Sequence, residues 1–314
     1  MPASHPVSSR PDRRRLRRWA LGVPLLLVLV SGLLFVWNGV LCARGTVPSA
    51  GVAETARPEA APLPRAGERL RVLAWNLAKC FVHHGGIAFS SRVEVERRVE
   101  RMAALIRGER PDLVFLSEVV TECTPCPVDQ VAHLARATGL PHWVFGENYN
   151  FGLPFLRIVG GNAILSRHPL EAVGNPDLAG RQPFWVTRNN RRVLLARMRT
   201  AAGPVLLGAM HTDSFDLGNN LRQTEQILGL GVGVSMLLAG DFNAEPDSPS
   251  LDAIAASRRF VGARYGPATF PADAPERRID YVFAPAGWKL VESRVLEACV
   301  SDHRAVLATF EMPR

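Results

Sequence analysis

Polar side chains stand at the ends of several apolar segments, where packing does not require them. Asn76 and Glu118 close two early segments, and His211 closes a later one. The rest of the set is Asp241, Asn243, Asp280, Asp302 and His303. Carboxylate and amide oxygens are the ligands that Mg²⁺, Mn²⁺ and Ca²⁺ prefer, whereas a zinc site would require more Cys and His at short spacing. The set therefore predicts a site for a hard divalent cation, which would neutralise a phosphate oxygen during displacement.

The two histidines add a second kind of chemistry to the same set. An imidazole that is held by a carboxylate can take a proton from water or bond to a phosphate oxygen. Taken singly, each residue also has an ordinary structural interpretation. Asn76 and Asp241 are good turn residues, and His303 has the alternative of being a structural histidine. The combination, rather than any one residue, indicates a site.

The elements that would position these side chains alternate in type along the chain. Period-two or continuous apolar patterns predict strands at 69–77, 112–119, 142–146, 162–166, 192–199, 204–211, 234–239, 278–283, 289–297 and 304–310. Helical spacing of apolar residues predicts helices at 93–106, 129–138 and 219–230. Strands come both as hairpins and separated by helices, so we expect an α+β body. Strand ends that meet at one sheet edge are a usual place for a site.

Short segments around these residues carry a family resemblance. They are AWNL (74–77), LSEV (116–119), GNAILSR (161–167), HTD (211–213), GDFN (240–243), TF (269–270), RIDYVF (278–283) and SDHRAV (301–306). In this order they resemble the endonuclease/exonuclease/phosphatase superfamily, which includes pancreatic-type deoxyribonuclease, abasic-site endonucleases, inositol polyphosphate 5-phosphatases and neutral sphingomyelinases. The resemblance covers essentially the whole body and implies a four-layer α/β/β/α sandwich, with the site at one end of two facing sheets.

The resemblance also implies a metal site that uses Mg²⁺ or Mn²⁺. Glu118 is similar to the principal metal ligand of the family, with Asn76 beside it. Asp302 would complete the metal or phosphate site. The family commonly has Gln-Glu where this chain has Ser117 and Glu118, but the carboxylate is kept.

The same resemblance implies catalytic roles. His303, paired with Asp280, would act as the general base or assist it, and His211 would bond to a phosphoryl oxygen. Asp241 and Asn243 would orient the attacking water and bind the phosphoryl group. Asn162 and Thr269 match family segments that bind substrate. The reaction implied is in-line attack of water on a phosphoester, without a covalent intermediate.

The N-terminal region differs in composition from the body. Residues 1–18 form a basic tail, and residues 19–43 contain no charged residue. That length suffices for a transmembrane anchor, and the arginines would keep the tail in the cytoplasm. Residues 44–67 are rich in Pro and Ala and predict a tether, followed by a catalytic domain at 68–314. We therefore expect a single-pass inner-membrane protein whose catalytic domain is periplasmic or extracellular, with a cleaved signal peptide as the alternative.

Charge and composition limit the function further. The chain of 314 residues is 47% hydrophobic and 21% charged, which excludes wholesale disorder. Seven of the 37 basic residues but only one of the 29 acidic residues lie before position 45, so the body is nearly neutral. This disfavours non-specific binding of long polynucleotides. A nuclease is the first expectation, a phospholipid or sphingolipid phosphodiesterase the alternative, and a non-catalytic binding module a third hypothesis.

Two further residue types leave alternatives. Cys123 and Cys126 fit a local disulfide after Glu118 if the domain lies in an oxidising compartment, and free thiols otherwise. A thiol redox motif is disfavoured because the strand-to-helix setting of that fold is missing. Lys79 and Lys289 are the only lysines, which we attribute to a compositional bias toward Arg.

Overall fold

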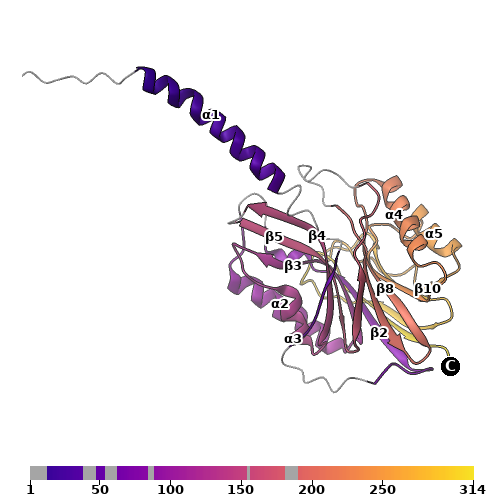
Figure 1. Cartoon of the computed structure of the whole chain (residues 1–314). Helices are drawn as coiled ribbons and strands as arrows, with labels where there is room; N and C mark the ends of the chain where they lie inside the picture. The colour runs from indigo at the N-terminus through magenta and orange to yellow at the C-terminus, as the bar shows by residue number, and fades with distance from the viewer. Residues whose placement is uncertain (1–12, 38–46, 54–61, 84–87, 154–155, 181–189) are drawn as a thin grey trace, which may run out of the picture.

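The computed structural model describes residues 13–37, 47–53, 62–83, 88–153, 156–180 and 190–314 (Figure 1). Two β-sheets face each other at the centre of the body, with helices on the outer side of each. The fold is thus an α+β sandwich, as predicted.

The first sheet has seven strands in the order β1-β4-β5-β3-β2-β13-β12. Its strands are β1 (Ser49–Val52), β2 (Arg69–Asn76), β3 (Leu113–Cys123), β4 (His142–Leu153), β5 (Leu156–Ser166), β12 (Lys289–Val295) and β13 (Val306–Glu311). β2 and β3 are parallel, which places Asn76 opposite Ser117 at their carboxyl ends. All other neighbours in this sheet are antiparallel.

The second sheet has six strands in the order β10-β11-β9-β8-β7-β6. Its strands are β6 (Leu170–Gly174), β7 (Leu194–Thr200), β8 (Gly203–His211), β9 (Met236–Asp241), β10 (Phe260–Gly262) and β11 (Asp280–Pro285). β8 and β9 are parallel and end together, with His211 opposite Asp241. β11 starts where β9 ends, because it runs antiparallel to β9. Three strand ends therefore present polar residues at one edge.

The helices begin at capping residues that the sequence supplies. They are α2 (Arg92–Glu109), α3 (Gln130–Thr138), α4 (Leu217–Leu230) and α5 (Pro249–Ala256). Ser91, Asp129, Asp216 and Ser248 each accept a bond from a backbone N–H of the first turn, which satisfies an otherwise free donor. The bends and loops between helices and strands lie at the two ends of the sandwich.

Three apolar cores account for the four layers. One core joins α2 and α3 to the first sheet, where Met102 and Trp75 are fully buried. A second core lies between the two sheets and includes Phe115 and Phe310. A third joins α4 and α5 to the second sheet around Phe242. Because burial of an apolar side chain contributes about 1.5–3 kcal/mol, these cores hold the sheets in fixed relation at the polar edge.

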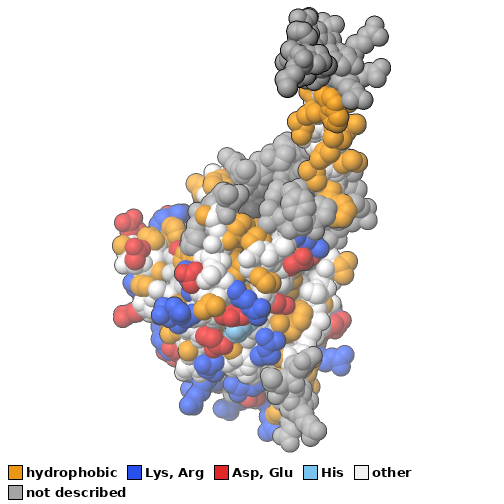
Figure 2. Space-filling model, turned by 90° about the vertical axis from the view of Figure 1, so that its left-hand side faces the viewer, with side chains coloured by type: hydrophobic (Ala, Val, Ile, Leu, Met, Phe, Trp, Pro, Cys, Tyr) orange, Lys and Arg blue, Asp and Glu red, His pale blue; other side chains and the backbone are white. Residues whose placement is uncertain are grey.

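Helix α1 (Arg13–Val36) projects from the body and carries exposed apolar side chains, such as Trp19 at 70% and Val28 at 68% exposure (Figures 1 and 2). The anchor predicted at 19–43 coincides with this helix as far as residue 36, and its residues 38–43 lie outside the described ones. Among the described residues, none of the helices combines the length and apolar composition that crossing a membrane requires.

The structure adds elements that the sequence patterns did not reveal: β1, β6, α5, β10 and a short 3₁₀ helix at Ala78–Phe81. β1 falls within the segment predicted as a tether and pairs with β4. An edge strand of four residues is held by backbone hydrogen bonds and needs no apolar period. α5 begins with Ser248 and Pro249, an N-cap and first-turn signal that could have revealed it.

Candidate active site

The polar edges of the two sheets meet and are cross-linked by the predicted site residues. Asn76 at the end of β2 donates from Nδ2 to Oδ2 of Asp241 at 3.0 Å, and β9 carries that carboxylate in the opposite sheet. Ser117 of β3 donates to the carbonyl of Met210 in β8 at 3.2 Å. Gly240 of the GDFN segment pairs with Met210 in the second sheet, and a Cβ there would lie 2.2 Å from the Met210 carbonyl oxygen, so glycine leaves this carbonyl accessible to Ser117.

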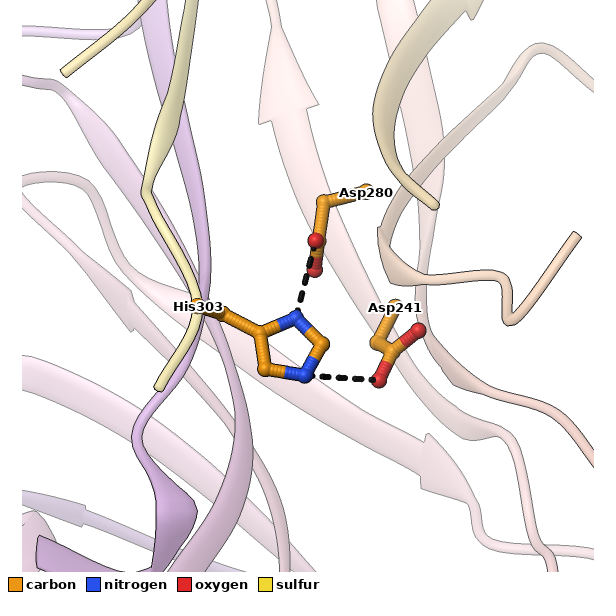
Figure 3. A group of neighbouring side chains, drawn as sticks. All are labelled: Asp241, Asp280 and His303. Carbon is orange, nitrogen blue, oxygen red and sulfur yellow. Dashed lines mark hydrogen bonds and ion pairs between the residues drawn. The ribbon is translucent and has the colours of Figure 1, made fainter. Parts of the chain in front are cut away.

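Asp241, Asp280 and His303 form a buried group between the sheets (Figure 3). Nδ1 of His303 bonds to Oδ2 of Asp280 at 2.9 Å, and Nε2 lies 3.8 Å from Oδ2 of Asp241. The backbone carbonyl of His303 accepts from Nε1 of Trp75 at 2.8 Å, and the ring lies 4.7 Å from that of Phe270. Asp280 and Phe270 therefore hold the imidazole and Trp75 holds its backbone, with Nε2 directed toward Asp241.

The charges of this group shift its proton affinities. Burial alone would lower the pKa of His303, but Asp280, Asp241 and Asp302 favour the imidazolium and raise the pKa to about 10. Burial and the neighbouring Asp280 carboxylate raise the pKa of Asp241. Oδ1 of Asp280 is buried and has no hydrogen-bond partner among the described residues.

His211 is fixed in one tautomer by an arginine. Nη1 of Arg191 lies 3.1 Å from Nδ1 of His211, and because a guanidinium only donates, Nδ1 must be the acceptor. Nε2 then carries the hydrogen, 3.6 Å from Oδ2 of Asp241 and 3.7 Å from Oε1 of Glu118. Burial lowers the pKa of His211 well below its usual value, and the charges of Arg191 and Lys79 lower it further. His211 thus presents an N–H donor toward the centre of the site.

Glu118 lies at an irregularity of β3, where the register with β5 shifts between Leu116 and Val119. Its φ of 53° is in the left-handed region. The carboxylate contacts the ammonium of Lys79 through Oε2. Burial would raise the pKa of Glu118, but the cations nearby, Lys79 first and Arg191 next, lower it below its usual value. Glu118 is therefore an ionised carboxylate that already holds a cationic group.

The donor set fits a hard divalent cation. Glu118 holds the ammonium of Lys79, and burial together with the charge of Glu118 raises the pKa of Asp302, so the charges of these two carboxylates act on each other. Asn76 and Asp241 supply further oxygens nearby. Figure 2 shows acidic, basic and histidine side chains gathered on one face of the body. Oxygen donors of this kind suit Mg²⁺ or Mn²⁺.

Comparison with known proteins agrees with this geometry. The family model described as the Endonuclease/Exonuclease/phosphatase family matches residues 73–303. The chain belongs to the endonuclease/exonuclease/phosphatase family. Members of the family hydrolyse phosphoester bonds and use divalent metals, so the chain is a phosphoester hydrolase. None of the curated proteins matches it in sequence.

Solved structures of the endonuclease/exonuclease/phosphatase family share the fold. One from Beutenbergia cavernae is 24% identical with a TM-score of 0.59, over 78% of this chain and 72% of that chain. A mannosyl-6-phosphatase from Bacteroides thetaiotaomicron is 16% identical with a TM-score of 0.54, over 77% and 99%. TDP2 of D. rerio, in complex with a single-strand DNA product, is 14% identical with a TM-score of 0.53, over 77% and 98%.

Within this family fold, the two residues predicted to bind substrate lie away from solvent. Thr269 is fully buried and accepts from the backbone N–H groups of Ile279 and Asp280 at 3.2 and 3.3 Å. Asn162 is also fully buried and donates to the carbonyls of Arg192 and Ala209. Their role in substrate binding stays a prediction, and the contacts present are with protein.

Asn243 follows Asp241 in a tight backbone turn. Its own N–H donates to Oδ1 of Asp241 at 2.9 Å, and its Nδ2 donates to the carbonyl of Thr212 at 3.1 Å. Its φ of 45° is in the left-handed region, which Asn tolerates better than most residues. Asn243 thus orients Asp241, while its predicted contact with a phosphoryl group stays a prediction.

Sequence reasoning missed three residues of this site: Lys79, Arg191 and Gln130. Nη1 of Arg191 contacts His211 from the segment before β7, and Arg191 belongs to none of the short sequence segments that carry the family resemblance. Gln130 at the start of α3 is fully buried, which is rare for an amide side chain and could have drawn attention only with the fold known. Lys79 follows Asn76 by three positions, so its proximity to the site was readable.

The predicted pairing of Cys123 and Cys126 needs correction. Both thiols are free and buried in the core between α2, α3 and the first sheet. The backbone N–H of Cys126 donates to the carbonyl of Cys123 at 3.1 Å, so a hydrogen-bonded turn closes this loop without a disulfide. Burial raises the pKa of both thiols, which disfavours the reactive thiolate.

Proposed function

We propose that this chain is a divalent-metal-dependent phosphodiesterase of nuclease type, which uses a water molecule for in-line attack on phosphorus. One observation carries the proposal: Asn76, Asp241, Asp280 and His303 are joined across the two sheets around a point that His211 and Glu118 also face. An acid–base pair, a neutral N–H donor and an ionised carboxylate are the groups that hydrolysis of a phosphoester requires.

The residues divide the work by their position. His303, held by Asp280, orients the attacking water together with the adjacent Asp241, and the carboxylate of Asp241 takes up its proton because the raised pKa of His303 keeps that imidazole protonated. The Nε2–H of His211 donates to a phosphoryl oxygen. The positive charge of Arg191 behind the imidazole favours the negative charge that develops on the phosphoryl oxygens during the reaction. Asn76 holds Asp241 in place from the opposite sheet.

A Mg²⁺ or Mn²⁺ ion would be held by Glu118, with Asn76 and Asp302 beside it. When bound, such an ion supplies Lewis-acid stabilisation of a phosphoryl oxygen. The support for this assignment is that Glu118 is ionised, attracts a cation and lies near a second carboxylate whose pKa burial and Glu118 raise.

An activity panel with the full-length protein in detergent tests the proposal. Plasmid DNA, RNA and sphingomyelin vesicles are each incubated with Mg²⁺ or with EDTA. We expect DNA or RNA cleavage that EDTA abolishes and that Asp280→Asn lowers by about 10²–10⁴-fold. Asp273→Asn, a change at an exposed aspartate, is the matched control and should leave the rate unchanged. Cleavage that persists in EDTA would refute the metal dependence.

We also propose that residues 19–43 attach the enzyme to a membrane, with the catalytic domain outside the cytoplasm. The exposed apolar side chains of α1 and the cluster of arginines between positions 10 and 18, most of them in the first residues of this helix, support this proposal. The same feature favours a second candidate function, hydrolysis of a phospholipid or sphingolipid, because attachment would hold the site near its substrate. Cleavage of vesicle lipid alone in the panel would select that function. Recovery of the full-length protein in the soluble fraction of cells would refute the attachment.

A further inference from the structure

A side chain of the protein itself places a cationic group on the proposed metal ligand. The ammonium of Lys79 contacts Oε2 of Glu118, and both side chains are largely buried, at 29% and 20% exposure. The charge of the same ammonium also acts on two neighbouring groups of the site, because it lowers the pKa of His211 and opposes the rise in the pKa of Asp302. Lys79 therefore neutralises the carboxylate that a divalent cation would use.

The backbone that carries Lys79 is strained. The four residues from Ala78 to Phe81 all have a positive φ, between 46° and 56°. A residue with a Cβ in this left-handed region costs about 1–2 kcal/mol. Such a turn persists only where its surroundings hold it, and strain of this kind concentrates at functional sites.

Three contacts hold the turn in place. Nε2 of Gln130 donates to the carbonyl of Lys79 at 2.8 Å. Nη1 of Arg98 donates to the carbonyl of Phe81 at 3.0 Å. The side chain of Cys80 is fully buried in the core beneath α2. The turn is thus anchored at Lys79 itself and at the two residues after it, which fixes where the lysine side chain starts.

One of these contacts also fixes the other half of the ion pair. Oε1 of Gln130 accepts from the backbone N–H of Val120 at 2.9 Å, two residues beyond Glu118. Gln130 is fully buried, and its amide therefore joins the Lys79 turn to the irregular part of β3. A single side chain holds the two partners at contact, so the pair is a built feature of the site and not a chance meeting of two flexible surface groups.

We propose that Lys79 is an internal competitor of the divalent cation for Glu118. A metal ion gains this carboxylate only when the ammonium leaves it, and the ammonium then faces the negatively charged phosphoryl group of the substrate. Until then the pair keeps Glu118 from being a buried, unpaired charge, which would be costly. The inference rests on the proposed metal-dependent function.

Titration calorimetry with Mn²⁺ alone tests this on the full-length protein in detergent. Lys79→Met removes the competing charge and keeps the length of the side chain and the backbone demands of the turn. We expect it to bind Mn²⁺ about 3- to 10-fold more tightly than the wild type. Lys79→Gln should act in the same direction, whereas Lys79→Arg should bind no more tightly than the wild type. Lys289→Met is the matched control on the exposed end of β12 and should leave the affinity unchanged.

The two proposals fail in different ways. The competition would be overturned if the folded Lys79→Met and Lys79→Gln variants bound Mn²⁺ no more tightly than the wild type. The metal site itself would stand if the wild type bound Mn²⁺ and Glu118→Gln abolished this binding. Absence of Mn²⁺ binding in every variant would overturn both. In steady-state hydrolysis of bis(p-nitrophenyl) phosphate, two quantities should change in opposite directions. Lys79→Met should lower the Mn²⁺ concentration that gives the half-maximal rate, and it should raise KM for the anionic ester.

Discussion

Replacement of Gln130 by leucine separates positioning from mere packing in this site. The side chains of glutamine and leucine are similar in size. Leucine, however, has neither the NH₂ group that donates to the carbonyl of Lys79 nor the oxygen that accepts from the N–H of Val120. The change therefore leaves the buried N–H of Val120 without a partner, whereas the carbonyl of Lys79 still accepts from the backbone N–H of Val82 at 3.1 Å. An unsatisfied buried group costs about 1–3 kcal/mol, so we expect Gln130→Leu to lower the free energy of unfolding by about 1–3 kcal/mol.

The same change should loosen the Lys79 turn and the strand that carries Glu118. A displacement of about 1 Å in a positioned group can lower a rate about 100-fold. We therefore expect Gln130→Leu to lower kcat/KM for bis(p-nitrophenyl) phosphate by at least about 10-fold and to weaken Mn²⁺ binding. Urea unfolding followed by circular dichroism, calorimetry and steady-state kinetics measure the three quantities on the full-length protein.

Gln226 of α4 provides the matched control. Its amide also joins two backbone groups, donating to the carbonyl of Asp177 and accepting from the N–H of Ala179, both at 2.9 Å. Gln226→Leu should destabilise the protein but leave kcat/KM and Mn²⁺ binding unchanged. If Gln130→Leu also kept full activity and metal affinity in the folded state, the positioning role of Gln130 would be refuted.

Three further outcomes follow from contacts described above. Burial raises the pKa of the Cys80 thiol from its usual 9.0 to about 12, so the thiol ionises first in the unfolded chain as pH rises. The free energy of unfolding should therefore fall by about 1.4 kcal/mol between pH 8 and pH 10 through this thiol. Urea unfolding at both pH values should show that Cys80→Ala removes this part of the loss, and an identical pH dependence in the variant would contradict it. Trp75→Phe leaves the carbonyl of His303 unpaired and should cost about 1–3 kcal/mol in urea unfolding, with no change as the contrary result. Arg191→Met removes the charge that fixes the tautomer of His211 and should lower kcat/KM about 100-fold, whereas full activity would show that the tautomer needs no arginine.

Local patterns predicted most of the fold because they act over a few residues. The helical spacing of Val95, Val99 and Met102 predicts α2, and the structure places all three in the core. Short edge strands such as β1 escape this reasoning, because backbone bonds to a neighbour distant in sequence define them. β4 likewise continues to Leu153, beyond the segment predicted at 142–146, because pairing with β5 extends it.

The candidate site was predictable in its residue types but not in its supports. Glu118, Asp241 and His303 are polar residues at strand ends, which a single sequence displays, and the structure gathers them at one edge. Lys79 carries no motif of its own, because its role arises from a left-handed turn and from contact with a residue 39 positions away. Gln130 acts over a separation of 51 residues, which no local pattern encodes.

The place of β13 determines when the proposed site can first be complete. β13 lies inside the first sheet, between β2 and β12, although it follows every other described strand in the sequence. His303 lies just before it, and the pairing of β13 with β2 holds His303 near Asp280. A growing chain therefore lacks this imidazole until position 303 has been made, after every other residue of the proposed site. Synthesis of the polypeptide is thereby separated in time from completion of its hydrolytic site.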